Sequence, residues 1–489
     1  MKNIKLPLFD IKDTGVIKEV KRGIVRIEGL TSCINGQLIQ LRPDLVGIVI
    51  GFDQEEVSVL VLGDENKVNI GNVVYGEENV FKVPASKDLI GRIVDIFGNP
   101  RDGKGKIGAA DWCPVFRDAP GVMDREPVSE PIITGINMID TLIPIGRGQR
   151  ELILGDRVTG KTTIATDSMI NQKGQDVICI FCWIGGSRSS FVKVIDDLKR
   201  GGAMDYTIVV SALASDSPAQ QYLAPYVATA IGEFFMYGGK DVLIAFDNLT
   251  KHAWSYRQLS LLLERSPGRE AYPGDIFFLH SQLMERATRL NNETGGGSVT
   301  FLPIVETQEG DITGLVPSNL VSMTDGQIYL NANLFNEGFR PAIDSGLSVS
   351  RIGSKVQCDA LKEVARPLKR EFAQYKELLS LLKIRTKLSQ EIEDRIKKGS
   401  ALRDLFIQDR GNPNSLEKEI ILFYAFNQEL PQVMDEAARK IIKEKLYPYI
   451  EENYADLIEE LNSQKMLTGD ITRQLDKIFN DFFRHYELE

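Results

Sequence analysis

The stretch GDRVTGKT at residues 155–162 constrains the fold of this chain more than any other feature. It satisfies the phosphate-loop pattern G-x-x-x-x-G-K-[ST] at every required position. In this pattern the glycines let successive backbone N–H groups turn into one concavity that binds phosphate oxygens. We expect the ammonium of Lys161 to reach the outer phosphates and the hydroxyl of Thr162 to bind a magnesium ion.

The residues on either side of this loop agree with the motif. The apolar run Leu152–Leu154 before it is typical of a buried strand. In the segment after it, Ala165 and Met169 fall four residues apart, on one face of a predicted helix. A helix that begins at the loop adds its own partial positive charge to the anion site. A strand, a glycine loop and a helix in this order predict a nucleotide-binding α/β domain.

The 489 residues divide into three kinds of sequence pattern. Residues 1–90 carry short apolar runs between turn signals, which predicts a small β-barrel or, alternatively, an edge sheet on the main domain. Residues 91–360 are predicted to form the nucleotide-binding domain: the chain is loop-rich to about 150, and from 150 to about 355 strand-like runs alternate with helical segments, which predicts a mostly parallel sheet covered on both faces. Residues 361–489 have helical periodicity and predict an all-α bundle. The strand-like runs of the middle part are ELILG, DVICIFCWI, YTIVVSAL, KDVLIAFDN, SVTFLPIVET and NLVSMTDGQIYL.

Composition excludes several classes of protein. The net charge of −10 argues against a broad nucleic-acid surface, which needs clustered Lys and Arg. No run approaches the roughly 18 apolar residues of a membrane span, and the N-terminus MKNIKLPLFDIKD lacks the apolar core of a signal peptide. We therefore expect a cytoplasmic protein that meets a membrane only through partners.

Cysteine and histidine usage gives no sign of a metal centre. Five cysteines are few and odd in number, which favours reduced thiols. Cys179 and Cys182 form a CxxC inside the apolar run VICIFCWI, so we expect buried strand thiols rather than metal or redox chemistry. His280 follows two phenylalanines and a leucine and is interpreted as a structural residue at a strand end.

The chemistry of the predicted site depends on strand ends. Asp247 closes the run DVLIAFD and is predicted to order the magnesium shell; an ordinary strand-end aspartate is the alternative. The strand after the phosphate-loop helix ends in WIGGSR at 183–188 and offers no carboxylate to orient a water molecule. This absence predicts a site that binds nucleotide and hardly hydrolyses it. Arg351, in GLSVSRIGS, is either a surface arginine or one that stabilises transition-state charge.

Longer motifs resemble a known family. The stretches PIGRGQRELILGDRVTGKT, ASDSPAQQYLAPY, SPGREAYPGDIFFLHSQLMERA, VSMTDGQIYL and RPAIDSGLSVSRIG closely resemble the alpha subunits of F-type ATP synthases and ATPases, from about residue 13 to the C-terminal helices. The resemblance implies a β-barrel, a RecA-like P-loop domain and a helical bundle. It also implies an alternating alpha3-beta3 hexamer around a gamma-type shaft, peripheral on the inner face of the cell membrane.

The resemblance also assigns residues, including two that sequence pattern alone does not single out. Asp247 matches the metal-side aspartate. Arg351 matches the arginine that reaches into the catalytic site of the neighbouring beta subunit, and Ser322 matches a serine at that interface. Residues matching those that bind ATP or ADP with Mg²⁺ are Arg157, Thr159, Gly160, Lys161, Thr162 and Thr163 for the phosphates and the ion, and Phe335 and Arg340 near the base.

The chain departs from the family pattern at several positions of this site. Gly186 and Val158 each replace a glutamine, Asn248 replaces a second aspartate, and Lys383 stands where we expect a glutamine of the adenine pocket. We expect these changes to leave the fold intact and to alter nucleotide affinity or exchange.

The segment before DTGVIKEV is shorter than the arm that grips the delta subunit in the family. This difference motivates an alternative hypothesis, an alpha-like subunit of a specialised F-type-like ATPase that hydrolyses ATP for mechanical work without a standard proton channel. An autonomous ATPase and a Rho-type ring helicase are further alternatives. The missing carboxylate argues against the first of these, and the acidic balance and long helical C-terminus argue against the second.

Overall fold

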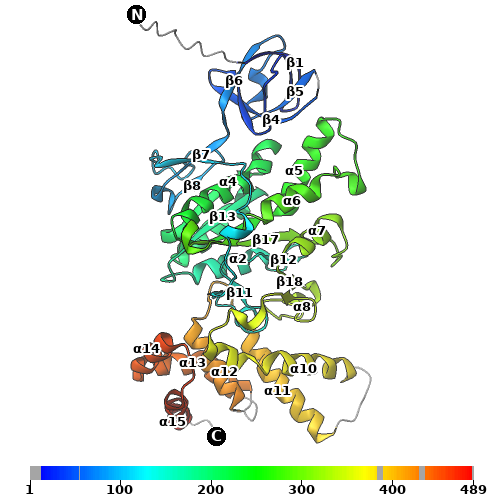
Figure 1. The fold of residues 1–489 in the computed structure, drawn as a ribbon. Helices are drawn as coiled ribbons and strands as arrows, with labels where there is room; N and C mark the ends of the chain where they lie inside the picture. Colours follow the sequence, from blue (N-terminus) through cyan, green and yellow to red (C-terminus); the bar gives the residue numbers. More distant parts are fainter. Residues whose placement is uncertain (1–12, 54, 383–388, 429–435, 487–489) are drawn as a thin grey trace, which may run out of the picture.

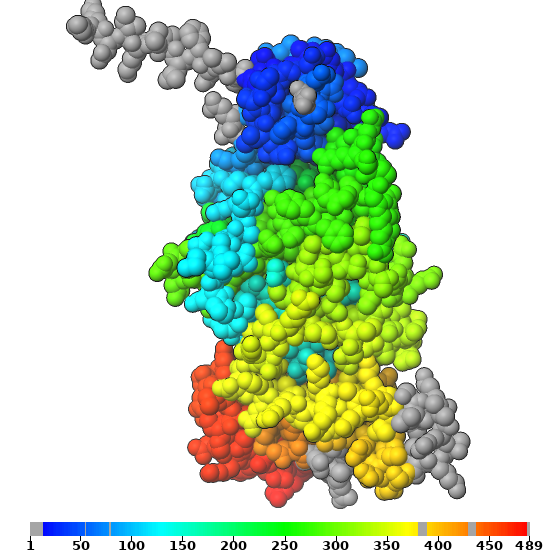
Figure 2. Space-filling view, turned by 45° about the vertical axis from the view of Figure 1, so that its right-hand side comes forward, coloured from blue at the N-terminus to red at the C-terminus, as the bar shows by residue number. Residues whose placement is uncertain are grey.

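The chain folds into three parts that follow one another in a column, with the N-terminal barrel at one end and the C-terminal helices at the other (Figures 1 and 2). The computed structural model describes residues 13–53, 55–382, 389–428 and 436–486. The predictions made for the N-terminal segment 1–12 and for Lys383 lie outside these residues. Among the described helices, none combines the length and the apolarity needed to cross a bilayer.

The N-terminal part is a closed six-stranded barrel and not an edge sheet of the main domain. Its strands alternate exposed and buried residues, so that side chains such as Ile17, Ile39 and Val59 fill the interior. The strand order is β1-β2-β5-β4-β3-β6, with antiparallel neighbours. The bounds are β1 Thr14–Lys21, β2 Ile24–Glu28, β3 Gln37–Arg42, β4 Leu45–Phe52, β5 Glu56–Val61 and β6 Val73–Val80.

Short elements connect the barrel to the central sheet. β7 (Lys82–Ala85) pairs with β9 (Asp111–Pro114), and β10 (Pro131–Ile132) pairs with β11 (Ile145–Gly146) around helix α1 (Asn137–Leu142). β8 (Ile93–Val94) joins the edge of the main sheet beside β14 (Thr207–Leu213).

The central sheet has the order β19-β18-β12-β17-β15-β13-β14-β8. It is parallel from β18 to β8, as the alternation of strands and helices predicts, while β19 and the short β16 pair antiparallel. The bounds are β12 Glu151–Gly155, β13 Val177–Gly186, β14 Thr207–Leu213, β15 Asp241–Asp247, β16 Thr288–Arg289, β17 Ser298–Glu306, β18 Gly326–Leu330 and β19 Val349–Ser350.

Helices cover both faces of this sheet, because successive strand residues point to opposite sides. Helices α2 and α3 share one core with alternate strand residues, and α4, α5 and α6 share another core with the remainder and with the base of the barrel. The helix bounds are α2 Lys161–Ile170, α3 Arg188–Arg200, α4 Pro218–Tyr237, α5 Leu249–Leu262, α6 Ile276–Met284, α7 Leu315–Met323 and α8 Ala332–Asn336.

Two local predictions are wrong. The run NLVSMTDGQIYL is half helix and half strand: α7 ends at Met323, and only Gly326–Leu330 forms β18. His280 lies inside α6 and not at a strand end, because Ile276, Leu279 and Leu283 place it on the buried face of that helix. Burial lowers the pKa of His280 to about 4, so the ring is neutral.

The C-terminal part is helical, as predicted, and its apolar side chains join the core under α2 and α3. The segment LKEVARPLKREF is broken at Pro367 into α9 and α10, because proline cannot donate the hydrogen bond that a continuous helix requires. The helices are α9 Asp359–Ala365, α10 Leu368–Leu382, α11 Gln390–Phe406, α12 Leu416–Asn427, α13 Glu436–Asn453, α14 Ala455–Gln464 and α15 Gly469–His485.

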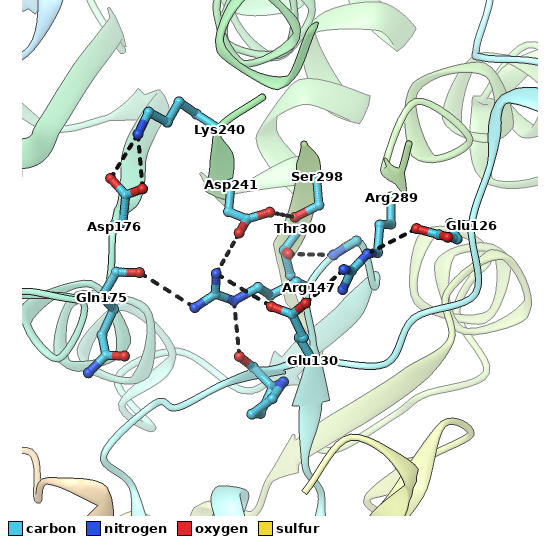
Figure 3. Close-up of polar contacts among 12 residues, drawn as sticks. Glu126, Glu130, Arg147, Gln175, Asp176, Lys240, Asp241, Arg289, Ser298 and Thr300 are labelled. Carbon is cyan, nitrogen blue, oxygen red and sulfur yellow. Dashed lines mark hydrogen bonds and ion pairs between the residues drawn. The ribbon is translucent and has the colours of Figure 1, made fainter. Parts of the chain in front are cut away.

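Ion pairs fasten the edge of the sheet where the strands begin (Figure 3). Arg147, just before β12, pairs with Asp241 at the start of β15, and Arg289 donates to Glu130 at 2.7 Å. The backbone N–H of Gly148 donates to Thr300 Oγ1 in β17 at 2.8 Å. These contacts fix the segment that leads into β12 and the phosphate loop. They lie where the strands begin, and ligands of such sheets bind at the other side, where the strands end.

Candidate functional site

A cavity of about 700 Å³ opens at the carboxyl ends of the central strands. That volume lies in the range of small-molecule sites. Nine of the eleven residues that sequence analysis assigns to the site line this one cavity: Arg157, Thr159, Gly160, Lys161, Thr162, Thr163, Asp247, Phe335 and Arg340. The other two, Arg351 and Ser322, are not among the residues that line it.

The phosphate loop has the backbone that its glycines allow. Gly160 adopts φ +102°, and a Cβ on Gly155 would lie 2.6 Å from the carbonyl oxygen of Leu330. Val158, at the tip, also has a left-handed φ of +64° and is 85% exposed. The loop therefore presents an apolar side chain at its outer rim, where the family resemblance predicts an amide.

Lys161 is buried and is held by its own loop. Its ammonium donates to the carbonyl oxygens of Gly155 and Asp156. Burial lowers the pKa of Lys161 because it disfavours the charged form, and the nearby Glu306 carboxylate acts in the opposite direction. An arriving phosphate would exchange neutral carbonyl partners of this ammonium for charged oxygens.

The metal side of the cavity joins the loop to the end of β15. The hydroxyl of Thr162 donates to Asp247 Oδ2 at 2.6 Å. Burial raises the pKa of Asp247, and the hydrogen bond from Thr162 opposes that shift. No group of three or more His, Cys, Asp or Glu side chains able to hold a metal occurs among the described residues. One hydroxyl and one carboxylate fit Mg²⁺, which is commonly bound through one or two protein groups together with substrate phosphates.

The part of the cavity that the resemblance assigns to the base combines residues from two domains. The guanidinium of Arg340 lies 4.6 Å from the ring centroid of Phe335. The segment Gln408–Pro413, between α11 and α12, adjoins them: the backbone N–H of Gln408 donates to the carbonyl oxygen of Arg340 at 2.8 Å, and sequence analysis missed this part of the wall. Gln408 joins this segment to the α1 region by donating to the carbonyl oxygen of Gly135 at 2.9 Å. The segment has no local pattern that points to a site, because the fold alone brings it there.

Glu306 is a second residue that sequence analysis missed. It ends β17 and lines the cavity beside the phosphate loop. Its carboxylate accepts from Asn248 Nδ2 at 2.9 Å and from Arg157 Nε at 3.3 Å. The signal was available in the strand-end glutamate of SVTFLPIVET, by the same rule that selected Asp247, but only the sheet order shows that β17 is the neighbour of β12.

Comparisons with known proteins match the two domains that line this cavity. Residues 135–350 match the nucleotide-binding domain of the ATP synthase alpha/beta family, and residues 357–482 match the C-terminal domain of ATP synthase alpha/beta chains. The chain is 48% identical to ATP synthase subunit alpha of Clostridium botulinum (strain Hall) over 472 residues, 96% of this chain and 93% of that protein. It is 46% identical over 477 residues to the protein of the same name from Clostridium acetobutylicum, 98% of this chain and 94% of that protein.

This chain belongs to the ATP synthase alpha/beta family. Membership confirms the resemblance drawn from the sequence and identifies the central part as a nucleotide-binding domain. It also favours an ATP synthase subunit over a Rho-type helicase as the class of this protein.

The end of β13 departs from the alpha-subunit pattern in a way that the structure explains. A Cβ on Gly186 would lie 2.2 Å from Cζ2 of the Trp183 indole, so the ring already fills the space of a side chain at 186. Trp183 is itself buried on the face that carries α2, level with Asp247 in the neighbouring strand. The strand end therefore has no carboxylate and no room for one while the indole keeps this position.

Arg351 and Ser322 lie at a different corner of this ATP synthase family member. Arg351 follows β19, and its backbone N–H donates to the carbonyl oxygen of Asp325 at 2.8 Å. Ser322 is in the last turn of α7, two residues before Thr324–Asp325, and its hydroxyl donates to Asn319 O at 2.6 Å. Both side chains are exposed, so this corner offers an arginine and a serine on a surface and not in a pocket.

Proposed function

We propose that this chain is the alpha-type subunit of a rotary F-type ATP synthase or ATPase. It binds ATP or ADP with Mg²⁺ at its own phosphate loop, hydrolyses little or none of it, and supplies Arg351 to the catalytic site of a neighbouring beta-type subunit. The relatives named ATP synthase subunit alpha and the family's nucleotide-binding domain support the subunit type. The partners are beta-type subunits in an alternating alpha3-beta3 ring and a gamma-type shaft, and membrane association is through partners only.

The observation that carries the proposal is the separation of two features on one sheet. Leu330, the last residue of β18, pairs with Gly155 of the phosphate loop. Gly326, the first residue of β18, pairs with Ser350, which directly precedes Arg351. Four residues of strand span roughly 13 Å. The two features therefore lie at opposite ends of the strands. Arg351 acts on a nucleotide bound to another subunit, and a neighbour in the ring is the natural candidate.

The residues around the phosphates account for binding without turnover. Lys161 and Arg157 supply positive charge, and Thr162 and Asp247 would hold the ion, which neutralises phosphate charge when bound. The end of β13 has Gly186 under the Trp183 ring, where a water-orienting carboxylate is absent. Glu306 does lie in the pocket, but both of its carboxylate oxygens already accept hydrogen bonds, from Asn248 and Arg157.

The state of the bound nucleotide tests this proposal against an autonomous ATPase. The purified chain is loaded with ATP and Mg²⁺, freed of excess ligand on a desalting column, and assayed for bound ATP, bound ADP and released phosphate over time. We expect the bound nucleotide to remain ATP, and the Lys161→Ala chain to retain none. Steady phosphate release by the isolated wild-type chain that Lys161→Ala abolishes would overturn the non-catalytic assignment.

The specialised F-type-like ATPase is a different reading of the same subunit type. It was motivated by the N-terminal segment, residues 1–12, which the structure does not describe. The subunit composition of the native complex tests it: co-purification of an ordinary delta-type subunit and a membrane sector supports the standard ATP synthase, and their absence supports the specialised machine.

A further inference from the structure

The Glu306 carboxylate is fixed at the phosphate end of the cavity from two sides. Asn248, at the end of β15, donates to Oε1, and Arg157, in the phosphate loop, donates to Oε2. The backbone N–H of Glu306 donates to Thr250 Oγ1 at 2.9 Å, which anchors the end of β17 to the start of α5. The Glu306 side chain is 16% exposed, whereas the Arg157 side chain is 71% exposed. The carboxylate is therefore the fixed member of this ion pair and the guanidinium is the movable one.

This carboxylate changes the charge that an incoming ligand meets. The phosphate end of the cavity carries three cations, Arg157, Lys161 and Lys251, and the two carboxylates of Asp247 and Glu306. Asp247 faces the Thr162 hydroxyl on the metal side. Glu306 instead faces Arg157 and lies close enough to Lys161 to be the strongest charged influence on it. It therefore offsets the cations that would attract phosphates.

A metal-free triphosphate and a metal-bound one respond differently to such a charge. The free form carries about four negative charges and the magnesium complex about two, and the repulsion from a fixed carboxylate grows with ligand charge and with burial. The same carboxylate thus penalises the free form more than the complex.

We propose that Glu306 is a specificity-determining residue that restricts this site to the divalent-metal complex of the nucleotide and keeps Arg157 paired until the phosphates displace it. The inference rests on the proposed nucleotide binding at this cavity and adds which form of the nucleotide enters.

Asn248 is the residue that keeps this selector in place. Its amide donates a proton to Glu306 Oε1 at 2.9 Å, which an aspartate at this position could not do without bringing two carboxylates together. The departure from the family pattern at position 248 therefore goes with a Glu306 carboxylate held by a neutral donor.

The test is the affinity of the full-length chain for ATP, measured by titration calorimetry in excess Mg²⁺ and, separately, in EDTA. For Glu306→Gln we expect affinity for metal-free ATP to rise about tenfold, while affinity for the magnesium complex changes less than about threefold. For Asn248→Asp, which adds a charge at the same place, we expect the opposite: weaker binding of metal-free ATP and a larger ratio between the two affinities. Circular dichroism melts confirm that each variant is folded.

Glu309→Gln is the matched control. It removes the same charge three residues further along the chain, from an exposed side chain that does not line the cavity, and should change neither affinity more than about twofold. If Glu306→Gln leaves the ratio unchanged, or lowers affinity only for the magnesium complex, Glu306 is not a selector and the proposal fails. Failure of the wild-type chain to bind ATP in either buffer would instead refute the proposed nucleotide site, which separates the two hypotheses.

Discussion

The phosphate loop and the Arg351 corner contain the two cationic side chains most directly tied to the proposed chemistry, and their surroundings are opposite. Lys161 is 6% exposed and donates to two backbone carbonyl oxygens inside a pocket with walls from two domains. Arg351 is exposed, and its backbone N–H donates to the carbonyl oxygen of Asp325, three residues after Ser322. In the proposed function, the first belongs to a binding site complete within one chain, and the second is one part of a site that another chain completes.

This difference predicts that substitutions of the two residues show their effects in different assays. A residue inside a complete pocket should govern what this chain binds, whether or not the chain is assembled. A residue on an exposed corner should matter only when a neighbour is present. Of the three predictions that follow, from the largest expected effect to the smallest, the first two test this contrast and the third tests how the helical domain beside the pocket is held.

Replacing Arg351 should give the largest effect, and only in the ring. We expect Arg351→Ala to lower ATP hydrolysis by the assembled alpha–beta ring by about 10³-fold or more, because an arginine that stabilises transition-state charge contributes roughly 10³–10⁵ in rate. Turnover is measured on complexes purified by gel filtration. Lys355→Ala, an exposed cation in the same loop, is the control and should retain turnover. Normal turnover of the Arg351→Ala ring would remove the contrast altogether.

Replacing Lys161 should show the reverse pattern. We expect Lys161→Ala to weaken nucleotide binding by the isolated chain by about 100-fold, because hydrogen bonds to charged groups each contribute about 1.5–3 kcal/mol. Turnover of the assembled ring should change far less than binding does. Equilibrium dialysis of the chain and hydrolysis by the ring provide the two measurements. A ring that assembles fully and yet loses all hydrolysis would mean that this site is itself catalytic.

The third prediction concerns how α12, the helix that follows the Gln408–Pro413 wall of the pocket, is docked against α1. Glu419, in the first turn of α12, is fully buried, and the carboxyl group of Asp140 in α1 is its strongest charged neighbour. Burial raises the pKa of Asp140 to about 6 and raises that of Glu419 well above its ordinary value. The folded chain thus keeps protons that the unfolded chain releases above pH 4 to 5.

Stability should therefore fall as the pH rises from about 5 through 6 and beyond. Glu419→Gln retains the shape, supplies an N–H donor to Asp140 and cannot ionise. We expect its thermal midpoint to drop about 2–4 °C less than that of the wild type between pH 5 and pH 8. Glu452→Gln, which changes an exposed glutamate of α13, should follow the wild-type profile. Identical pH profiles for Glu419→Gln and the wild type would show that the buried pair does not couple to docking of the C-terminal domain.

Local pattern was sufficient for much of the site. Residues adjacent in the chain predicted the phosphate loop, the strand-end position of Asp247 and the missing carboxylate at Gly186. Periodicities of two and of three to four residues predicted the barrel and the helical bundle. The same reasoning placed His280 at a strand end, where a short apolar run cannot distinguish strand from helix. It also extended a strand back through Asn319–Met323, which the structure assigns to α7.

What the amino-acid sequence determined by itself is the chemistry of single segments: a loop that binds phosphate, a strand end without a water-orienting carboxylate, and a three-part division of the chain. Only the tertiary structure decided which segments meet. Strand order places Glu306 beside the phosphate loop, the direction of β18 places Arg351 at the opposite strand ends from that loop, and domain docking brings Gln408–Pro413 to the pocket. The reason is physical: backbone propensity and capping act over a few residues, whereas neighbours in a sheet or across a domain boundary are selected by the burial of whole faces.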